Sequence, residues 1–178
     1  YLPYNYDCFD AGSLLSLHAL NQSLAPTLKF YHMKKIILSS FLFVTVGFIV
    51  SAAEIVINGN DTMQFDVKAF DVKAGEKVSL TLKNSGKLPK IAMGHNIVLL
   101  KKGVTAIGFG QKALGAGANA TNPLPDSVKA DAIAWSKLLG PGESDTVSFT
   151  APKEPGIYEY VCTFPGHFAM MRGTMTVK

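Results

Sequence analysis

Cysteine is scarce in this sequence, and its scarcity limits how the chain can be stabilised. The 178 residues include two cysteines, Cys8 and Cys162, and only Cys162 lies beyond residue 53. Small exported domains often depend on disulfide bonds, but one cysteine cannot form such a bond within its own chain. A domain that begins after residue 53 must therefore fold without a disulfide, and Cys162 is free for other chemistry.

The sequence also lacks a basic cluster and an apolar segment long enough to span a membrane. Lys and Arg number 17 against 13 Asp and Glu, and the lysines are scattered along the chain. Binding to nucleic acid or to a membrane surface requires basic residues grouped on one face. The apolar segment at residues 36–50 is shorter than the ~20 residues of a spanning helix. We therefore expect no nucleic-acid partner and no stable membrane insertion of the mature form.

Residues 33–53 have the order of charged, apolar and small residues that is typical of a secretory signal peptide. Residues 33–35 (Met-Lys-Lys) are positively charged, residues 36–50 carry no charge, and small residues follow at 51–53. We interpret this segment as a signal peptide, and we expect the exported chain to begin at Glu54.

Residues 1–32 precede that start, begin with tyrosine and show no sustained period or motif. We interpret them as a spurious upstream extension of the reading frame, with a disordered leader as the alternative. The cysteine and two histidines within them are then not part of the folded domain, which we expect at residues 54–178.

Side chains that bind metals gather near the C-terminus. Residues 162–171 read Cys-Thr-Phe-Pro-Gly-His-Phe-Ala-Met-Met and contain a thiol, an imidazole and two thioethers. The proline and glycine favour a turn in which these side chains converge, whereas a continuous strand would send alternate residues to opposite faces. We expect Cys162, His167 and one of the two methionines to belong to one site.

A thiolate, imidazoles and a weak thioether together suit copper. The second imidazole is expected from His95, because His95 and His167 are the only histidines beyond residue 53. Two other interpretations are open. The cysteine, histidines and methionines can each be core residues, and a structural zinc site is less suited because zinc has little use for methionine.

These segments resemble the copper-binding loop of azurins, within the cupredoxin or blue-copper family. The four residues Thr-Phe-Pro-Gly between Cys162 and His167 favour azurins over plastocyanins and amicyanins. The similarity also includes residues 58–61, 88–89, 93–96 and 138–140. Residues 54–178 are thereby identified as a plastocyanin-like azurin domain that binds copper.

The resemblance implies a single type 1 copper ion with strong ligands in one plane and weak ligands above and below it. The implied groups are the side chains of His95, Cys162 and His167 in the plane, Met171 as the weak axial ligand and the carbonyl of Gly94 opposite it. It also implies that Asn96 braces the cysteine loop, next to Thr163. Many azurins carry a further buried histidine at the place of Asn84, so the pH response associated with that histidine should be missing or altered.

Alternation of apolar and polar residues recurs at strand length. Val78, Leu80 and Leu82 share one face of residues 78–83, which predicts a strand. Further predicted strands lie at residues 54–59, 64–72, 95–100, 146–150, 157–162 and 174–178. The sequence Phe-Asp-Val-Lys-Ala at residues 65–69 is repeated at once at residues 70–74, and its odd period predicts a bulge or bend.

Many short strands bounded by turn residues predict an antiparallel sandwich. The resemblance makes this an all-β, cupredoxin-like Greek-key β-sandwich. Between residues 106 and 142 the alternation lapses, which predicts a small helical insertion. We expect Trp135, within that insertion, to pack partly against the barrel wall.

The expected function is that of a blue-copper electron carrier in the bacterial periplasm, cycling between Cu(I) and Cu(II). A copper storage or delivery module is the alternative, and it would favour exposed, exchangeable ligands. An enzyme is not expected, because the implied ligands leave no open position for a substrate.

We expect a surface of apolar residues around His167 through which a redox partner approaches. Azurins imply a c-type cytochrome or a reductase as that partner. The residues of this predicted docking patch are Leu88, Met93, Phe164, Pro165, Phe168, Ala169 and Met170.

Overall fold

The computed structural model describes residues 52–178. The predicted upstream extension and all but the last two residues of the predicted signal peptide lie outside the described residues. Within residues 52–178, no helix has both the length and the apolar character needed to cross a bilayer.

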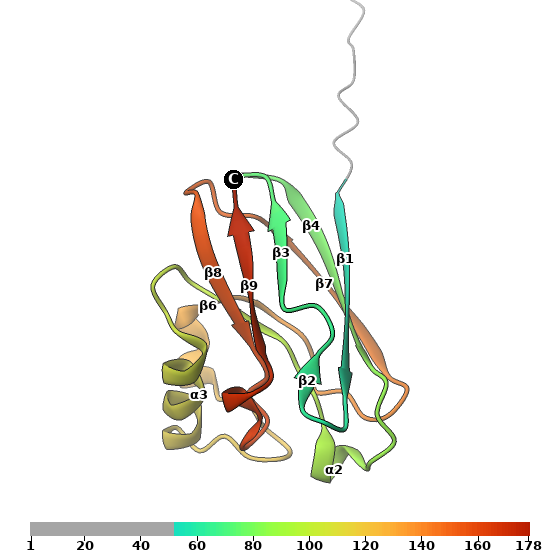
Figure 1. The fold of residues 1–178 in the computed structure, drawn as a ribbon. Helices are drawn as coiled ribbons and strands as arrows, with labels where there is room; N and C mark the ends of the chain where they lie inside the picture. The colour runs from blue at the N-terminus through green and yellow to red at the C-terminus, as the bar shows by residue number, and fades with distance from the viewer. Residues whose placement is uncertain (1–51) are drawn as a thin grey trace, which may run out of the picture. The chain divides into compact units, whose positions relative to one another are not determined.

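Two β-sheets pack face to face in this part of the chain (Figure 1), as the sequence predicted. The first sheet has the strand order β2-β1-β4-β7 and the second has the order β3-β9-β8-β5-β6. The strands are β1 (Ala53–Asn60), β2 (Gln64–Phe65), β3 (Ala69–Val72), β4 (Lys77–Asn84), β5 (Val98–Leu100), β6 (Ala132–Trp135), β7 (Ser144–Thr150), β8 (Gly156–Val161) and β9 (Arg172–Val177).

Four short helices accompany the sheets: α2 (Lys90–Met93), α3 (Ala106–Gly115), η2 (Asp126–Asp131) and η3 (His167–Ala169). Helices α2 and η3 and strand β6 were not predicted. Strand β6 has the sequence Ala-Ile-Ala-Trp, and alanine gives little strand signal. Trp135 at its end is 41% exposed, consistent with partial packing on the sheet.

The expectation of wholly antiparallel strands is wrong at two pairs. Strand β1 runs parallel to β4, and β3 runs parallel to β9. The cause lies in the connection between β2 and β3. The chain leaves the first sheet after Phe65 and enters the second at Ala69, so β2 and β3 together make the return path and β4 runs in the same direction as β1 (Figure 1).

The single strand predicted at residues 64–72 is therefore two strands in different sheets, with the predicted bend between them. The two phenylalanines of the repeated sequence both pack against one tyrosine. The ring centroids of Phe65 and Phe70 are 5.6 and 5.7 Å from that of Tyr160. The two copies of the repeat thus begin in different sheets, the first in β2 and the second in β3.

The two faces of the second sheet are both buried. Leu99, Tyr160 and Cys162 lie in the main core between the sheets, whereas Val98 and Val161 pack under α3 in a second cluster. At the end of β8, the successive residues Tyr160 and Val161 therefore lie in different clusters, as expected for side chains of period two. Cys162 is therefore presented at the end of the main core, just beyond the last residue of β8.

Candidate metal centre

Three potential metal ligands converge in the main core. The ligand atoms of His95, Cys162 and His167 all lie within 4.8 Å of one another, and all three residues are buried. Cys162 Sγ is 3.7 Å from His167 Nδ1, and the two imidazole centroids are 5.2 Å apart. The structure thus brings together the residues that the sequence selected from two separate segments.

The segment Cys162–Met171 closes on itself through short-range hydrogen bonds. The N–H of His167 donates to the carbonyl of Phe164 (3.0 Å), and the N–H of Met171 donates to that of His167 (2.8 Å). The N–H of Cys162 donates to the carbonyl of Met171 (2.9 Å). Gly166 has φ of 84°, which favours glycine. The turn therefore places Cys162 and Met171 opposite each other.

The two adjacent methionines have opposite environments. Met171 is fully buried, whereas Met170 is 51% exposed. A Cβ atom on Gly59 would lie 2.6 Å from Met171 Cε and 3.1 Å from His95 Cδ2. The thioether end of Met171 and the imidazole of His95 therefore lie against the same glycine, and Met171 is the methionine placed to reach the centre.

His95 enters the centre from the chain after α2. It forms an isolated antiparallel bridge with Leu139, and the strand predicted to start at His95 begins only at Val98. Gly94 ends α2, and a Cβ atom there would lie 2.7 Å from the carbonyl oxygen of Lys90. Gly94 is therefore sterically required, and its role as a carbonyl ligand stays a prediction.

Asn96 and Thr163 each follow a potential ligand and form a reciprocal pair. The N–H of Thr163 donates to Asn96 Oδ1 (2.9 Å), and Asn96 Nδ2 donates to Thr163 Oγ1 (2.9 Å). Both residues are buried. These two bonds connect the segment that carries His95 to the segment that carries Cys162 and His167.

His95 has the clearest sign of a missing partner. Neither Nδ1 nor Nε2 has a hydrogen-bond partner among the described residues, although both atoms are buried. Buried polar atoms are seldom left without a partner. Burial lowers the pKa of His95, while the carbonyl of Asn60 and the carboxylate of Asp61 act to raise it. A neutral imidazole with a free electron pair suits a metal ion.

Burial shifts the other two potential ligands toward their neutral forms as well. It raises the pKa of Cys162 to about 11, against the opposing effect of the N–H groups of Asn96 and Phe164. It lowers the pKa of His167 to about 4, with a further contribution from His95. A metal ion that binds here must therefore displace the thiol proton of Cys162.

The donor set fits copper. A thiolate, two imidazoles and a nearby thioether match the ligands that copper takes in blue-copper sites. Zinc sites usually have four strong ligands, and the metal-binding cluster in residues 52–178 has three such residues.

The predicted docking patch is only partly exposed. Leu88, Ala169 and Met170 are exposed, and Met93, Pro165 and Phe168 are half-buried. Phe164 is 5% exposed and belongs to the main core, so it does not contribute to the surface as predicted. Its ring packs against His167 at a centroid distance of 4.6 Å, which explains its burial.

Sequence reasoning assigned no role to three residues around the centre, Gly59, Leu139 and Ile91. Gly59 and Leu139 carry no side-chain chemistry that would mark them, and the contact of Leu139 with His95 is made by backbone atoms. Ile91 is 60% exposed on α2 and would join the docking patch. Asn84 was noted only through the resemblance, and the structure shows it bonded to Leu139.

The fold and the cluster define a class of protein, a β-sandwich with one buried centre of a thiolate and two imidazoles at its end. Residues 51–178 match the family described as copper binding proteins, plastocyanin/azurin family. The chain belongs to this family, and its cofactor is copper.

Individual proteins similar to this chain are azurins and auracyanins. Azurin from Alcaligenes faecalis is 40% identical over 130 residues, which cover 70% of this chain and 97% of that protein. Reduced auracyanin from Roseiflexus castenholzii has a TM-score of 0.61 at 36% identity and covers 72% of this chain and 98% of its own. Auracyanin A from Chloroflexus aurantiacus, described as a "blue" copper protein, has a TM-score of 0.61 at 34% identity, with 72% and 100% covered.

Proposed function

We propose that the protein is a blue-copper electron carrier of the bacterial periplasm. The observation that carries the proposal is the convergence of three buried ligand atoms within 4.8 Å. Copper would be held by His95, Cys162, His167 and Met171, with the carbonyl of Gly94 as a further ligand. Bound copper supplies a one-electron couple between Cu(I) and Cu(II).

The residues around the centre support this function by holding the ligands still. The pair of Asn96 and Thr163 links the two ligand segments, and Gly59 lies against both Met171 and His95. A site that changes little between the two copper oxidation states needs little reorganisation when an electron moves. Burial of the ligands also excludes water from them.

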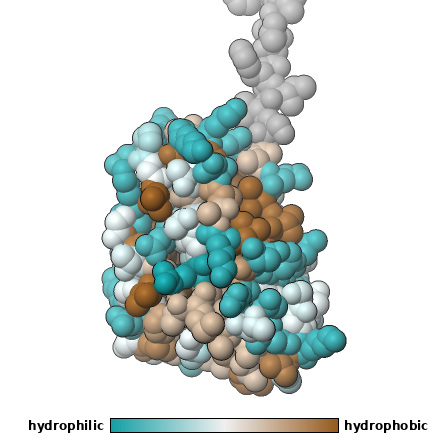
Figure 2. Space-filling view, viewed as in Figure 1, coloured by the Kyte–Doolittle hydropathy of each residue, from teal (hydrophilic) through white to brown (hydrophobic). Residues whose placement is uncertain are grey.

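The docking patch, with Ile91 added and Phe164 removed, is the proposed contact surface for a redox partner. Its segments, α2 and the residues before β9, lie at the same end of the sandwich (Figure 1). Apolar atoms gather at that end in the space-filling view (Figure 2). His167 is 3% exposed, so electrons would pass through its edge at this surface. A c-type cytochrome or a reductase is the proposed partner.

A copper storage or delivery module is less consistent with the burial of the ligands. Delivery requires ligands that an acceptor can reach, whereas His95, Cys162 and Met171 are fully buried. An enzyme is also disfavoured, because five ligand groups would leave no position for a substrate.

A charge in the docking patch tests the carrier function. Met170→Lys should retain the blue colour, because Met170 points away from the centre. It should slow electron exchange with a partner and between copies by about tenfold or more, since a docking interface disfavours charge at its middle. Stopped-flow absorbance measures both rates.

Ile157→Lys is the matched control. Ile157 is also an exposed apolar residue, 61% exposed, and lies at the start of β8, whereas Cys162 follows its end. This variant should exchange electrons at the native rate. Undiminished exchange in Met170→Lys, together with lost copper transfer to an apo acceptor, would overturn the carrier proposal in favour of delivery.

Export is tested separately by the intact mass of the protein recovered outside the cytoplasm. The expected mass is that of a chain beginning at Glu54, because small residues occupy the positions required for signal-peptide cleavage. A membrane-bound species that retains residues 36–50 would contradict this location and indicate an anchored carrier.

A further inference from the structure

The backbone of His95 is held at a single point of the sheet. His95 precedes β5 and pairs only with Leu139, through N–H to carbonyl bonds of 3.0 and 2.7 Å. A residue inside a continuous ladder is also fixed by the pairs on either side of it. Here Leu139 fixes the backbone of His95 directly, whereas Asn96 and Ile97 after it are bonded separately, to Thr163 and Ser136.

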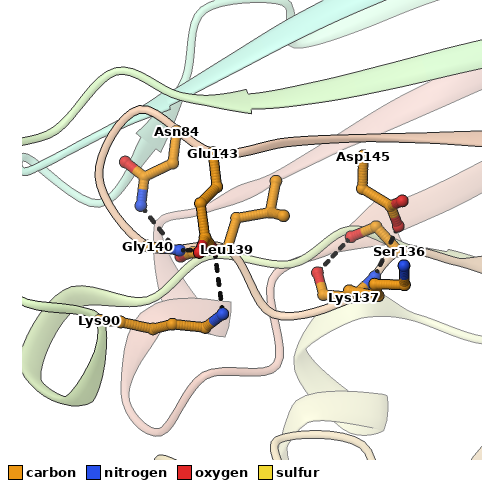
Figure 3. Close-up of polar contacts among 8 residues, drawn as sticks. All are labelled: Asn84, Lys90, Ser136, Lys137, Leu139, Gly140, Glu143 and Asp145. Carbon is orange, nitrogen blue, oxygen red and sulfur yellow. Dashed lines mark hydrogen bonds and ion pairs between the residues drawn. The ribbon is translucent and has the colours of Figure 1, made fainter.

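Asn84, at the end of β4, holds Leu139 in turn. Its Nδ2 donates to the carbonyl of Leu139 (3.1 Å), as Figure 3 shows. The same carbonyl also accepts from the N–H of His95. The Oδ1 of Asn84 accepts from the N–H of Gly86 (2.9 Å). Asn84 is 2% exposed, and both polar atoms of its amide are thus bonded in a buried site.

The turn after Leu139 is fixed from the surface side. Glu143 Oε2 accepts from the N–H of Gly140 (2.7 Å) and from Lys90 Nζ (2.9 Å), as Figure 3 shows. The ion pair of Lys90 and Glu143 is half exposed and contributes little. The buried amide of Asn84 is the stronger constraint on Leu139, because a buried hydrogen bond is costly to break.

We propose that Asn84 is a positioning residue for His95. Asn84 fixes the carbonyl of Leu139, and Leu139 fixes the depth at which the imidazole of His95 enters the copper centre. A small shift matters there, since changes that reorient a metal ligand cost about 10- to 100-fold in metal affinity. The proposal rests on His95 being a copper ligand, and the measurements on metal-free protein below do not depend on it.

Two substitutions separate this role from a role in the turn at Gly86. Asn84→Asp keeps the oxygen that accepts from Gly86 but replaces the donor to Leu139 with an acceptor. Asn84→Ala removes both bonds and buries no charge. If Asn84 positions His95, both variants bind Cu(II) about tenfold or more weakly, and both change the copper hyperfine splitting in electron paramagnetic resonance. If it serves only the turn, the Asp variant is close to native.

Hydrogen exchange of the metal-free protein gives an independent measurement. The amide of His95 should exchange about tenfold faster in both variants, relative to amides in the middle of β4. Should the Asp variant fail to fold, the Ala variant still gives this comparison. Native exchange at His95 in the Ala variant would overturn the proposal even if copper affinity fell.

Tyr158→Phe is the control for a general loss of stability. It also removes one side-chain bond to a carbonyl, that of Glu154 (2.9 Å), at the start of β8. This variant should lose stability without a change in copper affinity or in the relative exchange of His95. If it weakens copper binding as much as Asn84→Asp does, the effect of Asn84 is general and the proposal is wrong.

Discussion

The two segments that carry the ligands are held in different ways. Residues Cys162–Met171 carry three of the four proposed side-chain ligands, and the bonds between backbone groups within them connect residues close in sequence. His95 depends instead on residues far away in the chain, namely Gly59, Leu139 and, through its neighbour Asn96, Thr163. The loop therefore defines much of its own geometry, whereas the position of His95 depends on the assembled sandwich.

This difference predicts which changes act locally and which act through the fold. A change inside the loop should alter the centre with little effect elsewhere. A change at the supports of His95 should alter both the centre and the stability of the metal-free protein. The following substitutions test that distinction, beginning with the largest expected effect.

Cys162→Ser should abolish the intense blue colour, because the thiolate is the ligand on which it depends. The protein should still fold, since the serine oxygen occupies a similar space. Visible absorption of the copper-loaded protein and circular dichroism of the metal-free form are the two measurements. Loss of folding rather than of colour alone would show that the loop is not locally defined.

Asn96→Leu removes the link between the two segments. The N–H and hydroxyl of Thr163 would lose their buried partner, which costs about 1 to 3 kcal/mol of unfolding free energy. Copper should still bind, but its reduction potential should shift and its affinity should fall. Denaturant unfolding and voltammetry measure these quantities. An unchanged potential with unchanged affinity would exclude the bracing role of Asn96.

Gly59→Ala adds a methyl group where the side chains of His95 and Met171 both pack against Gly59. The added Cβ would lie 2.6 Å from Met171 Cε, so the thioether must move. We expect a loss of about 1 to 3 kcal/mol, as for other overpacked cores, and a change in the visible spectrum. A native spectrum would mean that Met171 does not contact the metal.

Gly166→Ala tests the loop by itself. An alanine at φ of 84° costs about 1 to 2 kcal/mol, and no atom lies within 4 Å of the added Cβ. Gly75→Ala is a matched control, because Gly75 has φ of 74° and equally open surroundings in the turn between β3 and β4. Both should lose similar stability, but only Gly166→Ala should alter the copper spectrum.

Acid should weaken the hydrogen bonds that Asp66 accepts from Asn58, the residue before Gly59. Burial acts to raise the pKa of Asp66, but hydrogen bonds from the side chain and N–H of Asn58 and from the N–H of Val67 lower it overall. A lowered folded-state pKa contributes stability above the ordinary value of about 3.9, and this contribution is lost as the pH falls through the folded pKa. As the pH falls from 5 through the folded pKa of Asp66, Asp66→Asn should therefore lose less stability than the native protein.

The features predicted from the sequence are those encoded locally. The ligand residue types, the turn at Pro165 and Gly166, and the alternation at Val78, Leu80 and Leu82 all depend on near neighbours.

The features that were missed depend on contacts between distant parts of the chain. The parallel pairs arise from the change of sheet after Phe65, which no local pattern specifies. Phe164 was expected at the surface because it lies in a loop, but it fills the space beside His167. Gly59 contacts His95 and Met171 because it has no side chain, and Leu139 contacts His95 through backbone groups. The residue types at these two positions therefore give no sign of a role at the centre.

Strand β9 has a consequence for the timing of assembly. It is the last strand of the chain, yet it lies between β3 and β8 in the interior of its sheet. Its pair with β8 is local, but its pair with β3 joins segments far apart in the chain, and such pairs form late in folding because a long loop must close first. Until β9 is inserted, the loop before it has no fixed base, and Cys162 is a free thiol open to oxidants. The completed chain then encloses that thiol fully, so the interval between synthesis and closure is when the protein is most vulnerable to damage.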